Sequence, residues 1–234
     1  MFPVRYFQMP LMEFETEEFL SWQIFKESCL FTECRQCFHI SRERSSSLHD
    51  CRAPHISQLI NRIRRSKKLL VLDLDHTLIN DDSDEVVPVT RPYLRRFLTS
   101  VYKHYNLAIW SASSMKRIKR VLKELALDKD QRFRFSFLVC HKAMRSVKKG
   151  GKCVTTKPLA VIWENFCRWS AKNTIIIDDK GENFLRNPRE GLKIKRFECE
   201  RRDRELRKLS VYLRKISKYR DFRVLNHKKW KNCY

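Results

Sequence analysis

Short apolar runs alternate with segments of helical periodicity from about residue 67 to the end of the chain. A strand that is covered on both faces by helices carries a continuous apolar run, as the strands of parallel sheets do. We therefore expect strands at residues 69–73, 106–110, 135–139, 174–177 and 192–194. This pattern predicts an α/β fold, in which a parallel sheet lies between two layers of helices.

Apolar side chains recur at helical spacing in four segments between and after these strands. Pro92 stands at the expected first position of one helix, and Pro158 begins another. Residues 204–218 are expected to form a basic amphipathic helix that closes the fold. Ser113 or Ser114 can cap the remaining helix, whose polar face carries Lys116, Arg117, Lys119 and Arg120.

The composition of the chain changes near residue 66. Residues 1–20 hold four acidic residues and one basic residue, whereas residues 41–68 hold eight basic residues and two acidic ones. We expect residues 1–66 to be a divergent N-terminal extension, partly disordered or helical. Residues 67–234 have the length and the apolar pattern of one domain of ordinary size.

Two segments of that domain are predicted to be small additions to the sheet and its helices. Residues 80–89 leave room for a short flap, and residues 141–156, centred on KKGGK, have the composition of a surface β-hairpin. Neither segment is long enough for a large cap domain that would enclose a small substrate.

Charge and cysteine content bear on the surroundings of the protein. The net charge of +23 is large enough to attract nucleic acid, anionic lipid or an acidic protein surface. Nine cysteines without a short secreted framework favour reduced thiols in the cytosol or nucleus. No apolar run approaches 18 residues, and glutamates occupy the place of a signal peptide, so we expect a soluble intracellular protein with no membrane contact.

Two of the predicted strands end in carboxylates. Asp73, Asp75 and Thr77 follow the apolar run in LLVLDLDHTL, and the pair Asp178 and Asp179 follows TIII. Open α/β sheets bind ligands at the carboxyl ends of their strands, and paired carboxylates suit Mg²⁺. Taken alone, an Asp-x-Asp after a strand is also typical of a turn or a helix cap.

A hydroxyl and an ammonium group join these acids along the sequence. Ser111 follows the strand LAIW, and Lys157 opens a helix after a loop. Each has an ordinary alternative, since Ser111 alone would be interpreted as a cap and Lys157 alone as a solvated lysine. Together with the acids they supply a nucleophile, a hydroxyl, a cation and a metal-binding pair.

The order of these residues resembles the four motifs of the haloacid dehalogenase superfamily of phosphotransferases. Over residues 67–231 the chain is also similar to the phosphatase domain of the ubiquitin-like-domain-containing C-terminal-domain phosphatases, relatives of the phosphatases that act on the RNA polymerase II tail. The stretches that carry this similarity are KKLLVLDLDHTL, RPYLRRFLTSVY, IWSASSMK, KPLAVIW and IIIDDKGENFLRNPREGLKIKRF. The resemblance implies a Rossmann-like, HAD-like fold.

The resemblance also implies roles for the motif residues. Asp73 would be the nucleophile that forms an aspartyl-phosphate, and Asp75 the general acid that protonates the leaving oxygen. Mg²⁺ would be held by Asp73, the backbone carbonyl of Asp75 and Asp179, with Asp178 nearby. The residues implied to bind the phosphate are Thr77, Ser111 and Lys157.

By the same resemblance the protein would be a nuclear, monomeric protein serine/threonine phosphatase, with RNA polymerase II tail repeats or proteasome subunits as substrates. Two departures stand out: residues 1–66 lack the strand pattern of a ubiquitin-like domain, and residues 139–156 differ from the family insertion. One alternative is a catalytically idle HAD-fold protein that binds nucleic acid or protein through the basic runs NRIRRSKK and RRDRELRKLSVYLRK. A small-molecule phosphatase is disfavoured by the short flap.

The N-terminal segment offers a possible zinc site. Cys34 and Cys37 have the spacing of half a zinc site, with further cysteines and histidines on either side: Cys29, His39, His49, Cys51 and His55. The spacing of the other half is irregular. Incidental reduced cysteines in a poorly ordered extension are the alternative.

Overall fold

The centre of the fold is a sheet of six strands in a computed structural model that describes residues 56–59, 61–81 and 87–232. Five strands run parallel, whereas the edge strand β1 pairs antiparallel with β6. In spatial order the strands are β1 (Ile56–Leu59), β6 (Phe135–Val139), β5 (Tyr105–Trp110), β2 (Lys68–Leu72), β9 (Thr174–Asp178) and β10 (Gly191–Lys193).

The five parallel strands confirm the predicted fold class, and each lies within a residue or two of its expected place. The strand β1 was not predicted, and it lies ahead of residue 66, so the sheet begins before the compositional boundary. The division into residues 1–66 and 67–234 stays a prediction. The cysteines and histidines of the possible zinc site lie outside the described residues.

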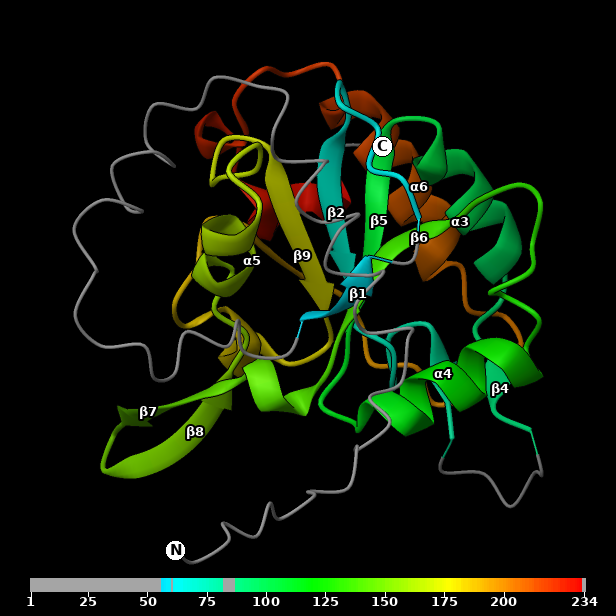
Figure 1. Cartoon of the computed structure of the whole chain (residues 1–234), viewed down its shortest axis with the longest axis horizontal. Coiled ribbons are helices and arrows are strands. Elements are labelled where there is room, and N and C mark those ends of the chain that lie inside the picture. The colour runs from blue at the N-terminus through cyan, green and yellow to red at the C-terminus, as the bar shows by residue number, and fades with distance from the viewer. Residues whose placement is uncertain (1–55, 60, 82–86, 233–234) are drawn as a thin grey trace, which may run out of the picture. The chain divides into compact units, whose positions relative to one another are not determined.

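Helices cover both faces of the sheet (Figure 1). Helices α3 (Leu94–Tyr102), α4 (Met115–Glu124) and α6 (Glu205–Ile216) pack on one face, and α5 (Ala160–Asn165) packs on the other. Successive side chains of a strand point to opposite faces, so β2 supplies Leu70 and Leu72 to the first apolar core and Leu69 and Val71 to the second. Short 3₁₀ helices lie at His141–Ala143 (η1), Gly181–Phe184 (η2), Phe222–Val224 (η3) and His227–Asn232 (η4).

The N-termini of α4 and α3 can be compared with the helix starts expected from the sequence. Ser114 caps α4, and its hydroxyl accepts a hydrogen bond from the Arg117 backbone N–H. Helix α3 begins at Leu94 rather than at Pro92, because Tyr93 has a left-handed backbone with φ 68° that interrupts the expected start. No helix among the described residues has the length and apolar character needed to cross a bilayer.

Two small sheets correspond to the predicted flap and hairpin. Strand β3 (Ile79–Asn80) pairs with β4 (Val89–Thr90) at the base of the flap. Strand β7 (Arg145–Lys149) pairs with β8 (Lys152–Thr156) through a two-residue turn. Both turn residues, Gly150 and Gly151, have positive φ values of 55° and 76°, which only glycine adopts readily.

Candidate active site

The carboxyl ends of three adjacent strands bring the motif residues together. Strand β2 lies between β5 and β9, with Leu72 in register with both Ile109 and Ile177. The residues that follow these strands therefore meet at one edge of the sheet. Asp73 is fixed there by its backbone N–H, which donates to the Ile177 carbonyl over 3.0 Å.

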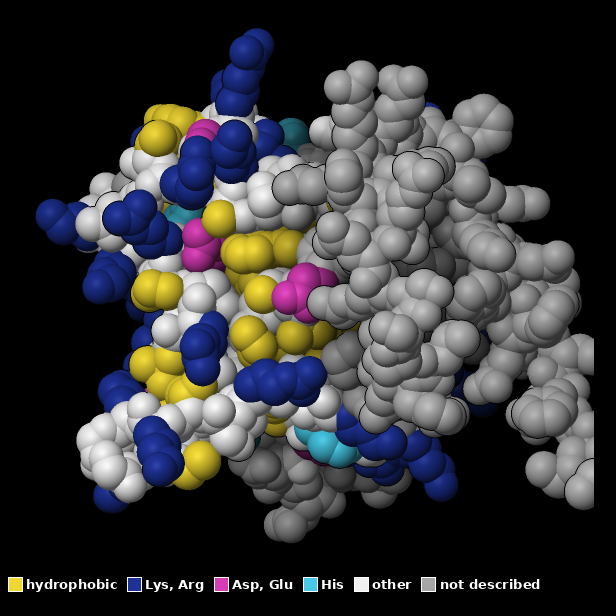
Figure 2. Space-filling view, turned by 60° about the vertical axis from the view of Figure 1, so that its left-hand side comes forward, with side chains coloured by type: hydrophobic (Ala, Val, Ile, Leu, Met, Phe, Trp, Pro, Cys, Tyr) yellow, Lys and Arg dark blue, Asp and Glu magenta, His cyan; other side chains and the backbone are white. Residues whose placement is uncertain are grey.

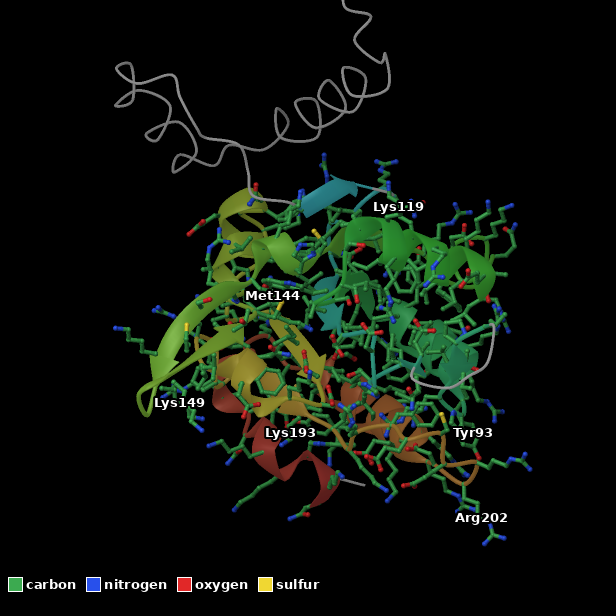
Figure 3. All side chains as sticks on the ribbon, turned by 90° about the horizontal axis from the view of Figure 1, so that it is seen from below. Tyr93, Lys119, Met144, Lys149, Lys193 and Arg202 are labelled. Atoms are coloured by element: carbon green, nitrogen blue, oxygen red, sulfur yellow. The ribbon has the colours of Figure 1, made fainter. Side chains whose placement is uncertain are left out.

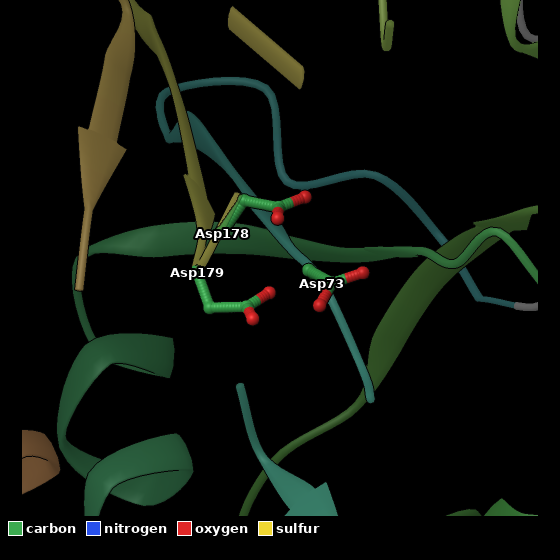
Figure 4. A group of neighbouring side chains, drawn as sticks. All are labelled: Asp73, Asp178 and Asp179. Carbon is green, nitrogen blue, oxygen red and sulfur yellow. The ribbon is translucent and has the colours of Figure 1, made fainter. Parts of the chain in front are cut away.

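Three buried carboxylates gather at this edge. Asp73, Asp178 and Asp179 each place a carboxylate oxygen within 4.8 Å of the others (Figure 4). Burial and the neighbouring Asp178 carboxylate raise the pKa of Asp179. Burial likewise raises the pKa of Asp73, to about 7, against the opposing charge of Lys157. Such a cluster is favourable only when positive charge lies close to it.

Lys157 provides part of that charge. Its ammonium Nζ donates to Asp73 Oδ1 at 2.5 Å, to Asp178 Oδ2 at 2.7 Å and to the Trp110 carbonyl at 2.8 Å. The side chain is fully buried, which rules out the alternative of a solvated lysine. Burial alone would lower the pKa of Lys157, but the carboxylates of Asp73 and Asp178 outweigh it and raise that pKa.

Asp178 and Asp179 differ in the hydrogen bonds that their carboxylate oxygens accept from the protein. Asp178 Oδ2 accepts from Lys157 and from the side-chain amide of Asn183, and Asp178 Oδ1 accepts from the Lys180 backbone N–H. Asp179 accepts from Arg196 at 3.2 Å. The oxygens of Asp73 and Asp179 are hard ligands of the kind that Mg²⁺ prefers, so the donor set fits the expected metal.

Asp75 lies apart from this trio and faces the end of β5. Its Oδ2 accepts from the Ser111 hydroxyl at 3.0 Å and from the Ser113 hydroxyl at 3.2 Å. Its Oδ1 accepts from the Arg117 guanidinium at 2.7 Å. Although partial burial opposes it, the Arg117 hydrogen bond and charge hold the pKa of Asp75 below its usual range.

The buried Arg91 side chain supports the loop that carries Asp73 and Asp75. The Arg91 guanidinium donates to the Thr77 carbonyl at 3.1 Å and to Asp203 Oδ2 at 2.8 Å, and its side chain is fully buried. The Thr77 hydroxyl is buried beside Asp73, where its interaction with the carboxylate acts against the rise in the pKa of Asp73.

All the motif residues predicted from the sequence therefore lie at one edge of the sheet, while several further groups were missed. The most consequential is Arg117, which was expected on the polar outer face of its helix but turns toward Asp75. Its place three residues after the cap Ser114 puts it in the first turn of α4, beside the strand end, and this position was the available clue. The other residues missed are Asp81, Ser113, Asn183 and Arg196.

The fold is similar to solved structures of known phosphatases. Two structures of the RNA polymerase II CTD phosphatase Fcp1 match with a TM-score of 0.51 and 14% sequence identity, and one of them is the fission yeast protein bound to beryllium fluoride. The match to the latter covers 68% of this chain and 70% of the other. At this level of identity the likeness concerns the fold alone.

Sequence comparison extends the likeness to a family. The ubiquitin-like domain-containing CTD phosphatases 1 of Gallus gallus and Homo sapiens are each 44% identical over 181 residues, which is 74% of this chain and 57% of theirs. The chain thus spans little more than half the length of these relatives. Residues 68–223, which contain every motif residue described above, match the family model of the NLI interacting factor-like phosphatases, and the chain belongs to that family.

Proposed function

We propose that this chain is a Mg²⁺-dependent protein serine/threonine phosphatase that works through an aspartyl-phosphate on Asp73. The observation that carries the proposal is the position of Asp73, with the buried Lys157 ammonium on its Oδ1 and Asp75 two residues away at the mouth of the site. Lys157 and the hydroxyls of Ser111 and Thr77 supply donors for the phosphate oxygens.

The reaction has two steps. In the first, a carboxylate oxygen of Asp73 forms a bond to phosphorus as the bond to the serine or threonine oxygen breaks, and Asp75 protonates that oxygen. In the second, water attacks the phosphorus while Asp75 takes one of its protons. The bond between Asp73 and phosphorus then breaks, and inorganic phosphate leaves.

The metal would be held by Asp73, by Asp179 and by the backbone carbonyl of Asp75, with Asp178 close by. When bound, Mg²⁺ supplies positive charge that screens the phosphate from the carboxylates. Asp178 then serves chiefly to hold Lys157, since both of its oxygens already accept hydrogen bonds from the protein.

The surroundings of the site and the names of the relatives support a proposal for the substrate class. Among the described residues the insertions into the sheet and its helices are a short flap and a hairpin, and the absence of a larger insertion there suits a phosphorylated segment of a protein. Lys and Arg side chains are spread over the described part of one face with few acidic groups (Figure 2), and Lys149 of the hairpin points outward (Figure 3). We propose phosphorylated RNA polymerase II tail repeats or proteasome subunits as substrates, a nuclear location and a monomeric catalytic domain over residues 67–234.

The same basic surface favours one other function, a binding protein with the fold but without turnover. Hydrolysis of a phosphoserine peptide and of 4-nitrophenyl phosphate with Mg²⁺ separates the two, with Asp73→Asn as the matched variant. The phosphatase proposal predicts turnover by the wild type and background rates for Asp73→Asn. Equal background rates for both proteins would overturn it in favour of binding.

A further inference from the structure

Arg117 makes contacts that an ordinary surface arginine of a helix does not make. One terminal nitrogen of its guanidinium donates both to Asp75 Oδ1 at 2.7 Å and to Asp81 Oδ2 at 2.6 Å. The other terminal nitrogen donates to the Ser113 hydroxyl at 2.7 Å, and that hydroxyl in turn donates to Asp75 Oδ2. Arg117 therefore reaches both oxygens of Asp75, one directly and one through Ser113.

The planar fork of the guanidinium fixes the orientation of the Asp75 carboxylate. Ser111 and Ser113 both contact Oδ2, so they leave the carboxylate free to turn about that oxygen. The contact from Arg117 to Oδ1 removes this freedom. A point charge such as lysine lacks the fork that contacts Ser113, Asp75 and Asp81 together.

The supports of Arg117 come from two separate parts of the fold. Helix α4 carries Arg117 in its first turn, immediately after the cap Ser114, and packs on the sheet through Ile118 and Val121. Asp81 follows strand β3 at the base of the flap. The side chains of Asp75, Asp81 and Arg117 are each about a quarter exposed, at 27%, 24% and 26%, so the group is open to solvent, unlike the buried carboxylates of Asp73, Asp178 and Asp179.

We propose that Arg117 is a positioning residue for Asp75 that ties the acid to α4 and to the base of the flap. The inference rests on the proposed function, in which Asp75 protonates the leaving oxygen. General acid catalysis requires the acid to lie within hydrogen-bonding reach of that oxygen, and a small displacement costs much of the rate. Arg117 acts through Asp75 and makes no contact with the reacting atoms.

This role predicts a dependence on the leaving group. A serine or threonine oxygen leaves as a strongly basic alkoxide unless it is protonated, whereas nitrophenolate leaves readily without a proton. Loss of Arg117 removes the charge that keeps the pKa of Asp75 low, but it also releases the carboxylate from its fixed orientation. We expect the loss of orientation to dominate and to slow formation of the phosphoenzyme from a phosphoserine peptide much more than from 4-nitrophenyl phosphate. The ratio kcat/KM reports this first step for both substrates.

The experiment measures kcat/KM for the two substrates in the wild type, in Arg117→Ala and in the control Arg120→Ala. Arg120 lies on the same helix, is 57% exposed in its side chain and has its Nε 3.9 Å from Glu124, so its loss removes the same charge away from the site. For Arg117→Ala we expect a loss of about tenfold or more on the phosphopeptide and less than about threefold on the aryl phosphate. Arg120→Ala should match the wild type on both.

Other results would overturn the inference. Equal losses on both substrates in Arg117→Ala would indicate a contribution to phosphate binding or to folding instead of to the position of Asp75. The same split in Arg120→Ala would assign the effect to the charge of the helix. If the wild type hydrolyses neither substrate, the result would contradict the proposed function, and this inference, which rests on it, would fall as well.

Discussion

The ammonium of Lys157 lies 2.5 Å from Asp73 Oδ1, and the lysine side chain is completely buried. It also contacts Asp178 Oδ2 at 2.7 Å, so one cation is shared by two carboxylates from different strands. Removing one partner of a buried ionic group leaves the others without compensation. We therefore expect the stability of the strand ends and the proposed chemistry of the site to depend on the same side chain.

Replacing Lys157 should damage both properties. In Lys157→Met we expect background phosphatase activity and a free energy of unfolding lower by about 3–5 kcal/mol, because Asp73 and Asp178 stay buried without their cation. Denaturant titration monitors the loss. Lys149→Met on the exposed hairpin removes a charge of the same kind and should change stability by no more than about 0.5 kcal/mol. A Lys157→Met protein as stable as the wild type would contradict this.

Metal binding should be visible without any measurement of activity. A ligand that binds only the folded state at a hundred times its Kd stabilises that state by about 2.7 kcal/mol, so Mg²⁺ should raise the Tm of the wild type. In Asp179→Asn the rise should shrink or vanish because the negative charge of the carboxylate is lost and one of its two oxygens is replaced by an amide nitrogen. Asp130→Asn, which breaks an ion pair with Arg95 elsewhere, should keep the full rise. The same rise in Asp179→Asn as in the wild type would exclude Asp179 as a ligand.

The buried pair of Arg91 and Asp203 should contribute to the stability of the loop that carries Thr77. In Arg91→Ala we expect a loss of about 3–5 kcal/mol in the free energy of unfolding, because the buried Asp203 carboxylate loses its cation. Arg95→Ala provides a control, because its partner Asp130 keeps a second cation in Arg132 at 2.7 Å, and the variant should cost no more than about 1 kcal/mol. Losses of equal size in the two variants would contradict the idea that a buried carboxylate left without any cation causes the loss.

The buried His227 should make stability depend on pH. Burial lowers its pKa from the usual 6.5 to about 4, while its Nδ1 lies 2.8 Å from the Tyr212 hydroxyl. As the pH falls, His227 therefore binds a proton near pH 6.5 in the unfolded chain but only near pH 4 in the folded chain. Stability should fall by up to about 3 kcal/mol as the pH drops through this window and level off below it.

Comparison with His227→Gln isolates this contribution, because glutamine does not titrate. The free energy of unfolding of the variant should fall less steeply between pH 6.5 and 4 than that of the wild type. Parallel curves for the two proteins over this range would contradict the assignment.

The sheet was predictable because strands that are buried on both faces have continuous apolar runs in the sequence. The strands β2, β5, β6 and β9 are nearly continuous apolar runs, and a parallel sheet requires such runs. The strand β1 lacks such a run. Its segment ISQL is short and lies at the edge of the sheet, where Ile56 pairs with Val139, a residue far away in the sequence. Contacts this far apart in sequence are invisible to a periodic pattern.

The site was predictable to the extent that it lies at strand ends. Asp73 and Ser111 each follow a strand and Asp178 is the last residue of β9, so their approach is a consequence of the topology. The topology does not determine the direction of a side chain on a helix surface. Arg117 was therefore predicted to lie on the outer face, although it points to Asp75. Likewise, the hydrogen bonds that separate Asp178 from Asp179 depend on a loop geometry that the sequence does not reveal.

The most direct test of the aspartyl-phosphate on Asp73 is to trap it. The wild type is mixed with a phosphoserine peptide and Mg²⁺, quenched in acid within the first turnover, digested and analysed by mass spectrometry. The account predicts a phosphate on the peptide that contains Asp73 in the wild type and none in Asp73→Asn. Turnover without any phosphate on that peptide, or undiminished turnover in Asp73→Asn, would contradict it.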